Sequence, residues 1–225
     1  MITITNPHES HALYQELQRM CPHYFASKNG VQYITDPFQI EGYELKTGER
    51  LGVLYKMDNH EIFVVDLVEK NGKMKIHGRI ILPSNGVIIV PRVGDKFVLE
   101  NQYRYPTCQT FLAFPRGHQE PGFAPEEDAI RETREELGAK LKNLKFLGKT
   151  YPETASNAWY CSVYLGDVEG LLTDESGTAW RDGYEGIDEL ILYSAAEIDE
   201  LIREGEISCG YTLAAWALYK ASLGG

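Results

Sequence analysis

The stretch that most constrains this 225-residue chain runs from Arg116 to Ala139 and reads RGHQEPGFAPEEDAIRETREELGA. It predicts a glycine-rich loop that leads into one short helix. Pro125 suits the first helical position, where a backbone N–H is not needed, and Gly138 suits a left-handed cap at the helix end. The acidic residues that follow Pro125 stabilise the start of the helix through the helix dipole.

Three glutamates are predicted to share one face of this helix. At about 100° per residue, Glu132, Glu135 and Glu136 fall within one sector of roughly 100°, and the apolar residues share another. Three neighbouring carboxylates repel one another unless a cation lies between them. Carboxylate oxygens are hard ligands that suit Mg²⁺ or Mn²⁺. The alternative is a solvated acidic helix face, and the glycine-rich loop before the helix favours the metal site.

The loop and the helix together resemble the Nudix box. The matching positions are Gly117, Arg131, Glu132, Glu135, Glu136 and Gly138. Two positions depart from the pattern, because Phe123 replaces the box glutamate and Thr133 replaces an aliphatic residue. In the family the missing glutamate is thought to brace the loop and the helix arginine. Arg131 is therefore expected to pair with Glu127 or Glu135, each four residues away on the same helix.

The resemblance implies a role for each charged residue of the box. Glu132, Glu135 and Glu136, with the main-chain carbonyl of Arg116, are the expected ligands of Mg²⁺ or Mn²⁺. Glu136, Glu135 and Arg131 are the expected catalytic residues, and Arg131 would orient the glutamates rather than touch the substrate.

A further carboxylate is expected to act as the general base. In relatives it comes from the long loop that corresponds to residues 166–186, which is rich in Gly, Asp and Glu here. Glu185 is the candidate, with Asp182 and Glu175 behind it.

The segments before the box are similar to the ADP-ribose pyrophosphatase branch of the family. Arg104 occupies the place of a family arginine that contacts phosphates or ribose, and an exposed arginine at a strand end is the alternative. Arg79 and Gly117 are further candidates for substrate binding. Ala113 stands where many relatives carry a glutamate that helps to hold the substrate.

The expected fold class is α+β: a Nudix α/β/α sandwich with a mixed β-sheet, preceded by a small antiparallel β-meander and an N-terminal helical extension. The expected segments are the extension over 1–48, the meander over 49–84 and the Nudix domain over 85–225. A helix is predicted after Asn6-Pro7 and loops with short strands over 24–48. By resemblance, the meander packs across a two-fold axis, which predicts a homodimer.

Hydrophobic runs and turn residues predict the remaining elements. Antiparallel hairpins are expected in the meander and in the segment before the box. Strands and two helices are expected after the box. The predicted strands cover 51–56, 61–69, 73–82, 87–91, 96–99, 144–151, 158–165 and 187–193.

Composition narrows the classes of partner. A formal net charge of −11 argues against a broad nucleic-acid interface, since such interfaces use Lys and Arg to displace counterions. Four cysteines without a CxxC pair, and an N-terminus without a signal segment, predict a reducing cytoplasm. No apolar run approaches the length that spans a bilayer, so no membrane partner is expected.

The resemblance implies metal-dependent hydrolysis of the pyrophosphate bond of a nucleoside diphosphate linked to another moiety. ADP-ribose, cleaved to AMP and ribose 5-phosphate, is the best single substrate; dinucleoside polyphosphates and coenzyme A are the alternatives within the enzyme class. A nucleotide-sugar-binding sensor with little or no turnover is the alternative outside it, motivated by Phe123 and Ala113. The complete Arg-Glu-x-x-Glu-Glu run favours catalysis.

Overall fold

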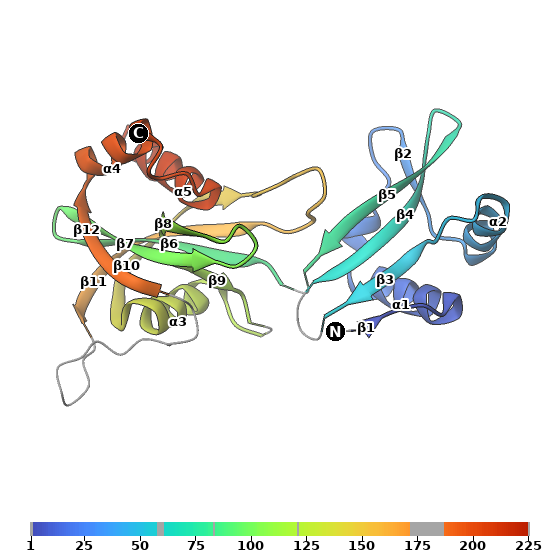
Figure 1. Cartoon of the computed structure of the whole chain (residues 1–225), viewed down its shortest axis with the longest axis horizontal. Helices are drawn as coiled ribbons and strands as arrows, with labels where there is room; N and C mark the ends of the chain where they lie inside the picture. The colour runs from blue at the N-terminus through green and yellow to red at the C-terminus, as the bar shows by residue number, and fades with distance from the viewer. Residues whose placement is uncertain (1, 58–60, 83, 121, 172–186, 225) are drawn as a thin grey trace. The chain divides into compact units, whose positions relative to one another are not determined.

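The computed structural model describes residues 2–57, 61–82, 84–120, 122–171 and 187–224. The chain forms two compact units, one of Met1–Pro83 with Glu153–Trp159 and one of Ser84–Pro152 with Tyr160–Gly225 (Figure 1).

The first unit contains a five-stranded antiparallel sheet with β4 at its centre. One edge of β4 pairs with β5 along its whole length, and the other edge pairs with β3 and then with β2. The predicted meander is therefore confirmed in its strands. The elements are β1 (Ile2–Thr3), α1 (Pro7–Met20), η1 (Pro22–Phe25), β2 (Val31–Ile34), α2 (Pro37–Thr47), β3 (Gly52–Lys56), β4 (Ile62–Lys70) and β5 (Lys73–Ile81).

The two helices of this unit begin in the same way. The side chains of Asn6 and Asp36 accept hydrogen bonds from the second helical N–H, at 3.0 and 2.9 Å, and a proline follows each cap. The predicted α1 is confirmed, whereas the expectation of only loops and short strands over 24–48 was wrong. In α2 only Ile40 is buried, so the helix lacks the apolar periodicity that would have revealed it.

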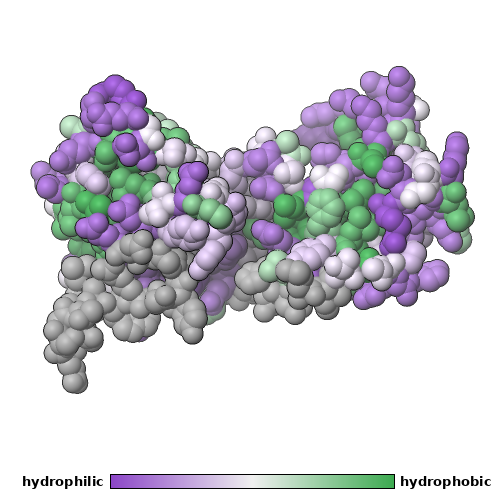
Figure 2. Space-filling view, in the orientation of Figure 1, coloured by the Kyte–Doolittle hydropathy of each residue, from purple (hydrophilic) through white to green (hydrophobic). Residues whose placement is uncertain are grey.

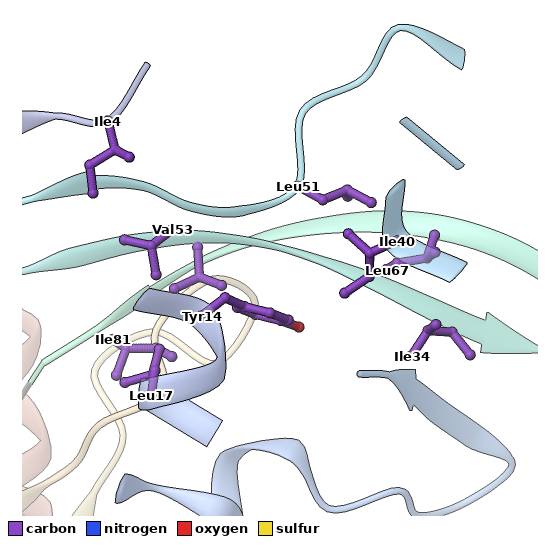
Figure 3. Packing of buried hydrophobic residues seen from close by; sticks show 10 residues of the cluster. Ile4, Tyr14, Leu17, Ile34, Ile40, Leu51, Val53, Leu67 and Ile81 are labelled. Carbon is purple, nitrogen blue, oxygen red and sulfur yellow. The ribbon is translucent and has the colours of Figure 1, made fainter. Parts of the chain in front are cut away.

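The core of this unit gathers aliphatic side chains from both helices and the sheet (Figure 3). Tyr14 and Leu17 of α1 pack with Val53 and Ile81 from the sheet. Residues of the 1–48 segment and of the meander thus share one sheet and one core. The structure places no division between compact units at residue 48.

A buried ion pair lies inside this unit. Arg79 of β5 is 7% exposed and Asp66 of β4 is 0% exposed, with Nε 2.6 Å from Oδ2. The Tyr14 hydroxyl donates to Asp66 Oδ1 at 2.6 Å, and Arg79 Nη1 donates to the Tyr24 carbonyl at 2.8 Å. Burial, followed by the charge of Asp66, raises the pKa of Tyr14. Arg79 therefore has a structural role in this unit.

Removing one partner of this ion pair should destabilise the protein strongly. In Asp66→Ala the Arg79 guanidinium stays buried without its counter-charge, and such losses cost about 3–5 kcal/mol. Urea denaturation of the full chain, followed by circular dichroism, measures the free energy of unfolding. Lys75→Ala, on the exposed end of β5, is the control and should change it by less than about 0.5 kcal/mol. An equally small change in Asp66→Ala would contradict the account of this pair.

The second unit contains a seven-stranded mixed sheet. Its elements are β6 (Gly86–Val93), β7 (Lys96–Arg104), β8 (Gln109–Ala113), β9 (Arg116–His118), α3 (Pro125–Leu137), β10 (Ala139–Thr150), β11 (Cys161–Leu171), β12 (Ile187–Ser194), α4 (Ala195–Glu204) and α5 (Gly210–Ala221). The strand order is β10-β11-β6-β7-β12, with β8 on β7 and β9 on β6, and β6 and β11 run parallel. In Figure 1, α3 covers one face of this sheet and α4 with α5 the other. The predicted α+β class and α/β/α sandwich are confirmed.

Several strand boundaries differ from those predicted; β7 extends to Arg104 and β10 begins at Ala139. Residues 116–118 pair with β6 as β9, although the glycine-rich sequence predicted a loop. The strand predicted over 158–165 begins at Cys161, because Glu153–Trp159 belongs to the first unit, where Ile80 N–H donates to the Ser156 carbonyl at 2.7 Å.

Figure 2 shows hydrophilic and hydrophobic residues interspersed over one face of the molecule. Within the described ranges, no helix is both long and apolar enough to cross a membrane.

Candidate active site

Helix α3 begins and ends as its sequence predicts. Pro125 is the first helical residue, and the Glu127 carboxylate accepts a hydrogen bond from the Ala124 N–H at 2.8 Å. Gly138 adopts φ +60 and ends the helix in the left-handed conformation. Since Glu127 bonds the helix start, it is not the partner of Arg131.

Two glutamates of α3 lie against the backbone of β9. Glu136 is 1% exposed, and its Oε2 accepts the Arg116 N–H at 2.9 Å. Glu132 is 8% exposed, and a Cβ built on Gly117 would lie 1.9 Å from its Cδ and Oε1. The glycine is therefore needed for the close approach of this carboxylate to the loop. Both carboxylates converge on the two residues that open the box.

Arg131 ties the helix to the loop. Its Nη2 donates to Glu132 Oε1 at 2.7 Å and to the His118 carbonyl at 2.9 Å, and its Nη1 donates to Glu135 Oε2 at 2.7 Å. Partial burial lowers the pKa of Arg131, but Glu132 and Glu135 outweigh it, so the pKa is raised overall. The predicted pair with Glu135 is confirmed, and the other predicted pair, with Glu127, does not form.

The acidic side chains fit a divalent cation by their chemistry. Glu132 and Glu136 supply buried carboxylate oxygens beside the Arg116–Gly117 backbone, and Glu135 lies on the same helix face. Across the part of the chain that the structure describes, no three His, Cys, Asp or Glu side chains form a ready cluster for a metal ion. The Arg131 guanidinium, a cation itself, bonds two of the three glutamates.

Two further arginines lie near these carboxylates. Arg116 stacks its guanidinium 4.0 Å above the centre of the Tyr211 ring and donates to Cys209 Sγ at 3.7 Å. Burial and then the charge of Arg116 lower the pKa of Arg104, while Glu100 and Glu136 oppose that shift. Arg104 Nη2 is buried and has no hydrogen-bond partner among the described residues. An anionic ligand with several charges would supply hydrogen-bond acceptors and negative charge to the Arg104 guanidinium.

Strand β7 carries a stripe of polar side chains that leads to Arg104. Glu100, Gln102 and Arg104 alternate along the strand and so share one face, and the first two are 0% exposed. Ala113 pairs directly with Glu100 in the ladder. The chain therefore places a carboxylate beside the position where many relatives carry one.

The second unit contains most of the predicted site residues. Gly117, Arg131 and the three glutamates lie in its strand β9 and helix α3, and the Arg116 backbone lies beside them. Arg79 belongs to the first unit, where it pairs with Asp66. Glu185, Asp182 and Glu175 lie outside the described residues.

Sequence reasoning missed three features of this region: the Arg116 guanidinium, Tyr211 and the buried Asp128. The box pattern uses Arg116 only through its carbonyl and places no requirement on Asp128. Tyr211 is 95 positions further along the chain than Arg116, and no motif joins the two.

Comparison with known proteins identifies the family to which this fold and this loop-helix geometry belong. A family model described as the NUDIX domain matches residues 82–205, which is more than half of the chain. This chain belongs to the NUDIX family, and the predicted resemblance is confirmed.

Named relatives also resemble this chain in sequence. The chain is 38% identical over 87 residues to the ADP compounds hydrolase NudE of Escherichia coli strain K12, covering 38% of this chain and 46% of that protein. It is 28% identical over 142 residues to the ADP-ribose pyrophosphatase of Bacillus subtilis strain 168, covering 62% of this chain and 75% of that protein. The match thus spans less than half of NudE.

A solved structure of an ADP compounds hydrolase has the same fold. It superposes with a TM-score of 0.66 at 20% identity, covering 77% of this chain and 91% of that one.

Proposed function

We propose that this protein is a Nudix pyrophosphohydrolase that cleaves the pyrophosphate bond of a nucleoside diphosphate linked to another moiety. The observation that carries the proposal is the convergence of Glu132 and Glu136 on the Arg116–Gly117 backbone, with Arg131 binding both helix and loop. A solvated acidic helix face would leave these carboxylates exposed, whereas Glu136 is 1% exposed. ADP-ribose, giving AMP and ribose 5-phosphate, is the substrate we favour.

Glu132, Glu135 and Glu136 would hold Mg²⁺ or Mn²⁺, with the Arg116 carbonyl as a further oxygen ligand. A bound divalent ion in such a site neutralises phosphate charge and lowers the pKa of water. Arg131 orients Glu132 and Glu135 through charge-assisted hydrogen bonds of 2.7 Å. Glu135 shares this guanidinium with Glu132, which supports its proposed place among the metal ligands.

Arg104 and Arg116 would bind the phosphates of the substrate. Both arginines are half-buried, and the charge of Arg116 contributes to the lowered pKa of Arg104. Among the described residues, neither guanidinium forms an ion pair with a carboxylate. Gly117 would contribute its backbone to the substrate site, and the absence of a side chain there lets the Glu132 carboxylate lie against the loop. Glu185 is the proposed general base, which would accept a proton from the attacking water.

Replacing Arg116 should weaken substrate binding more than it slows the reaction. Arg116→Met keeps the backbone that bonds Glu136 and removes the guanidinium, so we expect KM for ADP-ribose to rise about tenfold or more, the loss of one charge-assisted hydrogen bond. Steady-state kinetics measure kcat and KM separately. Arg92→Met is the control, because Arg92 pairs with Asp167 at 2.7 Å and touches none of these groups. An unchanged KM would show that the Arg116 guanidinium does not bind the substrate.

A substrate panel tests the proposed function. Purified protein with Mg²⁺ or Mn²⁺ is offered ADP-ribose, other nucleotide sugars, dinucleoside polyphosphates, coenzyme A and nucleoside triphosphates, and the phosphate-containing products are separated by chromatography. Turnover of ADP-ribose above the others supports the favoured substrate. Faster turnover of a dinucleoside polyphosphate or of coenzyme A than of ADP-ribose would assign the protein to another branch of the family.

The second candidate is a sensor that binds a nucleotide sugar without turnover, and Phe123 and Ala113 motivate it. It predicts that no substrate is cleaved although ADP-ribose raises the Tm. The buried carboxylate of Glu136 and its bond to the loop favour catalysis, because a binding protein does not need a buried acidic group beside its ligand's phosphates.

We also propose a cytoplasmic homodimer with a small nucleotide as its only substrate class. The net charge of −11 supports a substrate other than nucleic acid. The free cysteines support a reducing compartment. Dimerisation would use the 49–84 meander. Light scattering of the purified chain measures the oligomeric state, and a monomer at micromolar concentration would contradict this part.

A further inference from the structure

The box of this chain lacks the glutamate that braces the loop, yet its loop is held to α3. Phe123 stands at that position with 53% of its surface exposed, so its ring contributes little to the core. The loop is instead bound through Asp128, whose Oδ1 accepts the Glu120 N–H at 3.2 Å and Arg131 Nη2 at 3.3 Å. One carboxylate oxygen thus joins the loop backbone to the helix arginine.

Asp128 is placed as a positioning group rather than as a surface charge. It is 1% exposed, and it lies one helical turn before Glu132. Its Oδ2 is buried and has no hydrogen-bond partner among the described residues. A buried carboxylate oxygen without a partner costs stability, and the bonds that Oδ1 makes to the loop and to Arg131 offset that cost.

The brace leaves one donor of Arg131 unused. Arg131 Nε is buried and makes no hydrogen bond within the described ranges, and the nearest ion-pair partner on that side is Glu120 Oε1 at 3.7 Å. The resemblance implies that a glutamate at position 123 would brace this arginine. Asp128 bonds the same guanidinium through Nη2 at 3.3 Å.

We propose that Asp128 is the positioning residue that replaces the box glutamate, holding Arg131 and the 116–120 loop so that Glu132 and Glu135 face the metal. This inference deepens the proposed function and rests on it. Asp128 acts through Arg131, which bonds Glu132 and Glu135 at 2.7 Å each, and it is not one of the proposed metal ligands.

The test combines Asp128→Ala with Phe123→Glu. Removing a group that orients metal ligands costs about 10–100-fold in metal affinity or activity, so we expect Asp128→Ala to lower kcat and weaken Mn²⁺ binding within that range. Phe123→Glu alone should leave kcat within about threefold of the native protein. In the double variant the new carboxylate binds Arg131 again, and we expect most of the loss in kcat and Mn²⁺ affinity to be recovered.

Two controls separate positioning from folding. Glu127→Gln removes an acidic charge one residue away, from a group that bonds Ala124 and not Arg131, and should leave Mn²⁺ affinity unchanged. Asp128→Asn keeps the shape and one acceptor, and should show a smaller loss than Asp128→Ala. Calorimetry should place the Tm of all variants within about 4 °C of the native protein.

Two results would overturn the inference: native kcat and Mn²⁺ affinity in Asp128→Ala, or an impaired Asp128→Ala that Phe123→Glu does not rescue. If Asp128→Ala fails to fold, the same comparison is made with Asp128→Asn. Mn²⁺ affinity, measured by electron paramagnetic resonance, needs no turnover. A protein that hydrolyses nothing would thus refute the proposed function while the Mn²⁺ series still decides the role of Asp128.

Discussion

Glu136→Gln is expected to lower kcat for ADP-ribose by at least about a hundredfold, with little change in stability. Glu136 is buried, and its Oε2 accepts the Arg116 N–H at 2.9 Å, a bond that the glutamine amide oxygen can also accept. The substitution therefore removes one negative charge and keeps the shape of the site. Losing one charge-stabilising group from an active site commonly costs 10²–10³ in kcat, roughly 3–4 kcal/mol.

The measurement is AMP release under saturating substrate and Mg²⁺, with the free energy of unfolding from urea denaturation beside it. Glu127→Gln is the matched control, because it changes the same functional groups on the same helix at a residue that bonds only the helix start. Near-native turnover in Glu136→Gln would remove the box from the mechanism.

Gly117→Ala is expected to reduce activity by about a hundredfold through a single methyl group. The added Cβ would lie 1.9 Å from the Glu132 carboxyl, so that carboxylate has to move. Displacing a reacting group by about 1 Å can cost 10²-fold in rate. The contact involves the end of a flexible side chain and not backbone, so the fold can absorb the shift at small cost. Activity and stability should therefore separate.

The same assay and denaturation series test this prediction. Gly42→Ala is the control: a Cβ there meets nothing within 4 Å, and alanine within α2 should add up to about 1 kcal/mol of stability. Full activity in Gly117→Ala would mean that the Glu132 carboxylate can leave the loop without consequence, which contradicts its proposed role.

Features set by local sequence could be predicted from the chain. The ends of α3 follow from Pro125 and Gly138, since one suits the first turn and the other the left-handed cap. The i,i+4 spacing of Arg131 and Glu135 likewise predicted their pair, which forms at 2.7 Å. These statements involve residues close in sequence, for which helix geometry is sufficient.

Features set by distant segments could not be predicted. The return of Glu153–Trp159 to the first unit depends on hydrogen bonds with Ile80 that no turn residue signals. Helix α2 has strong caps, but it buries only Ile40, so its periodicity is weak. The Arg79–Asp66 pair likewise depends on the register of β4 with β5, which local sequence does not signal.

Phe123 in the box and Ala113 before it both stand where relatives carry a glutamate, and the two replacements have different consequences in the structure. At Phe123 the brace is lost, but Asp128 and Arg131 still hold the loop. At Ala113 a carboxylate is lost, but Glu100 lies opposite it in the ladder and shares a face with Arg104. Pattern matching counts both positions as losses, whereas the structure places an acidic group near each.

The most direct test of the central claim is AMP release from ADP-ribose by the purified native chain during a Mg²⁺ titration, with both products identified. We predict AMP and ribose 5-phosphate in equal amounts, a rate that rises with Mg²⁺ and saturates, and no product after EDTA is added. Product formation that persists in EDTA, or the absence of cleavage at every Mg²⁺ and Mn²⁺ concentration, would contradict the assignment of this protein as a metal-dependent pyrophosphohydrolase.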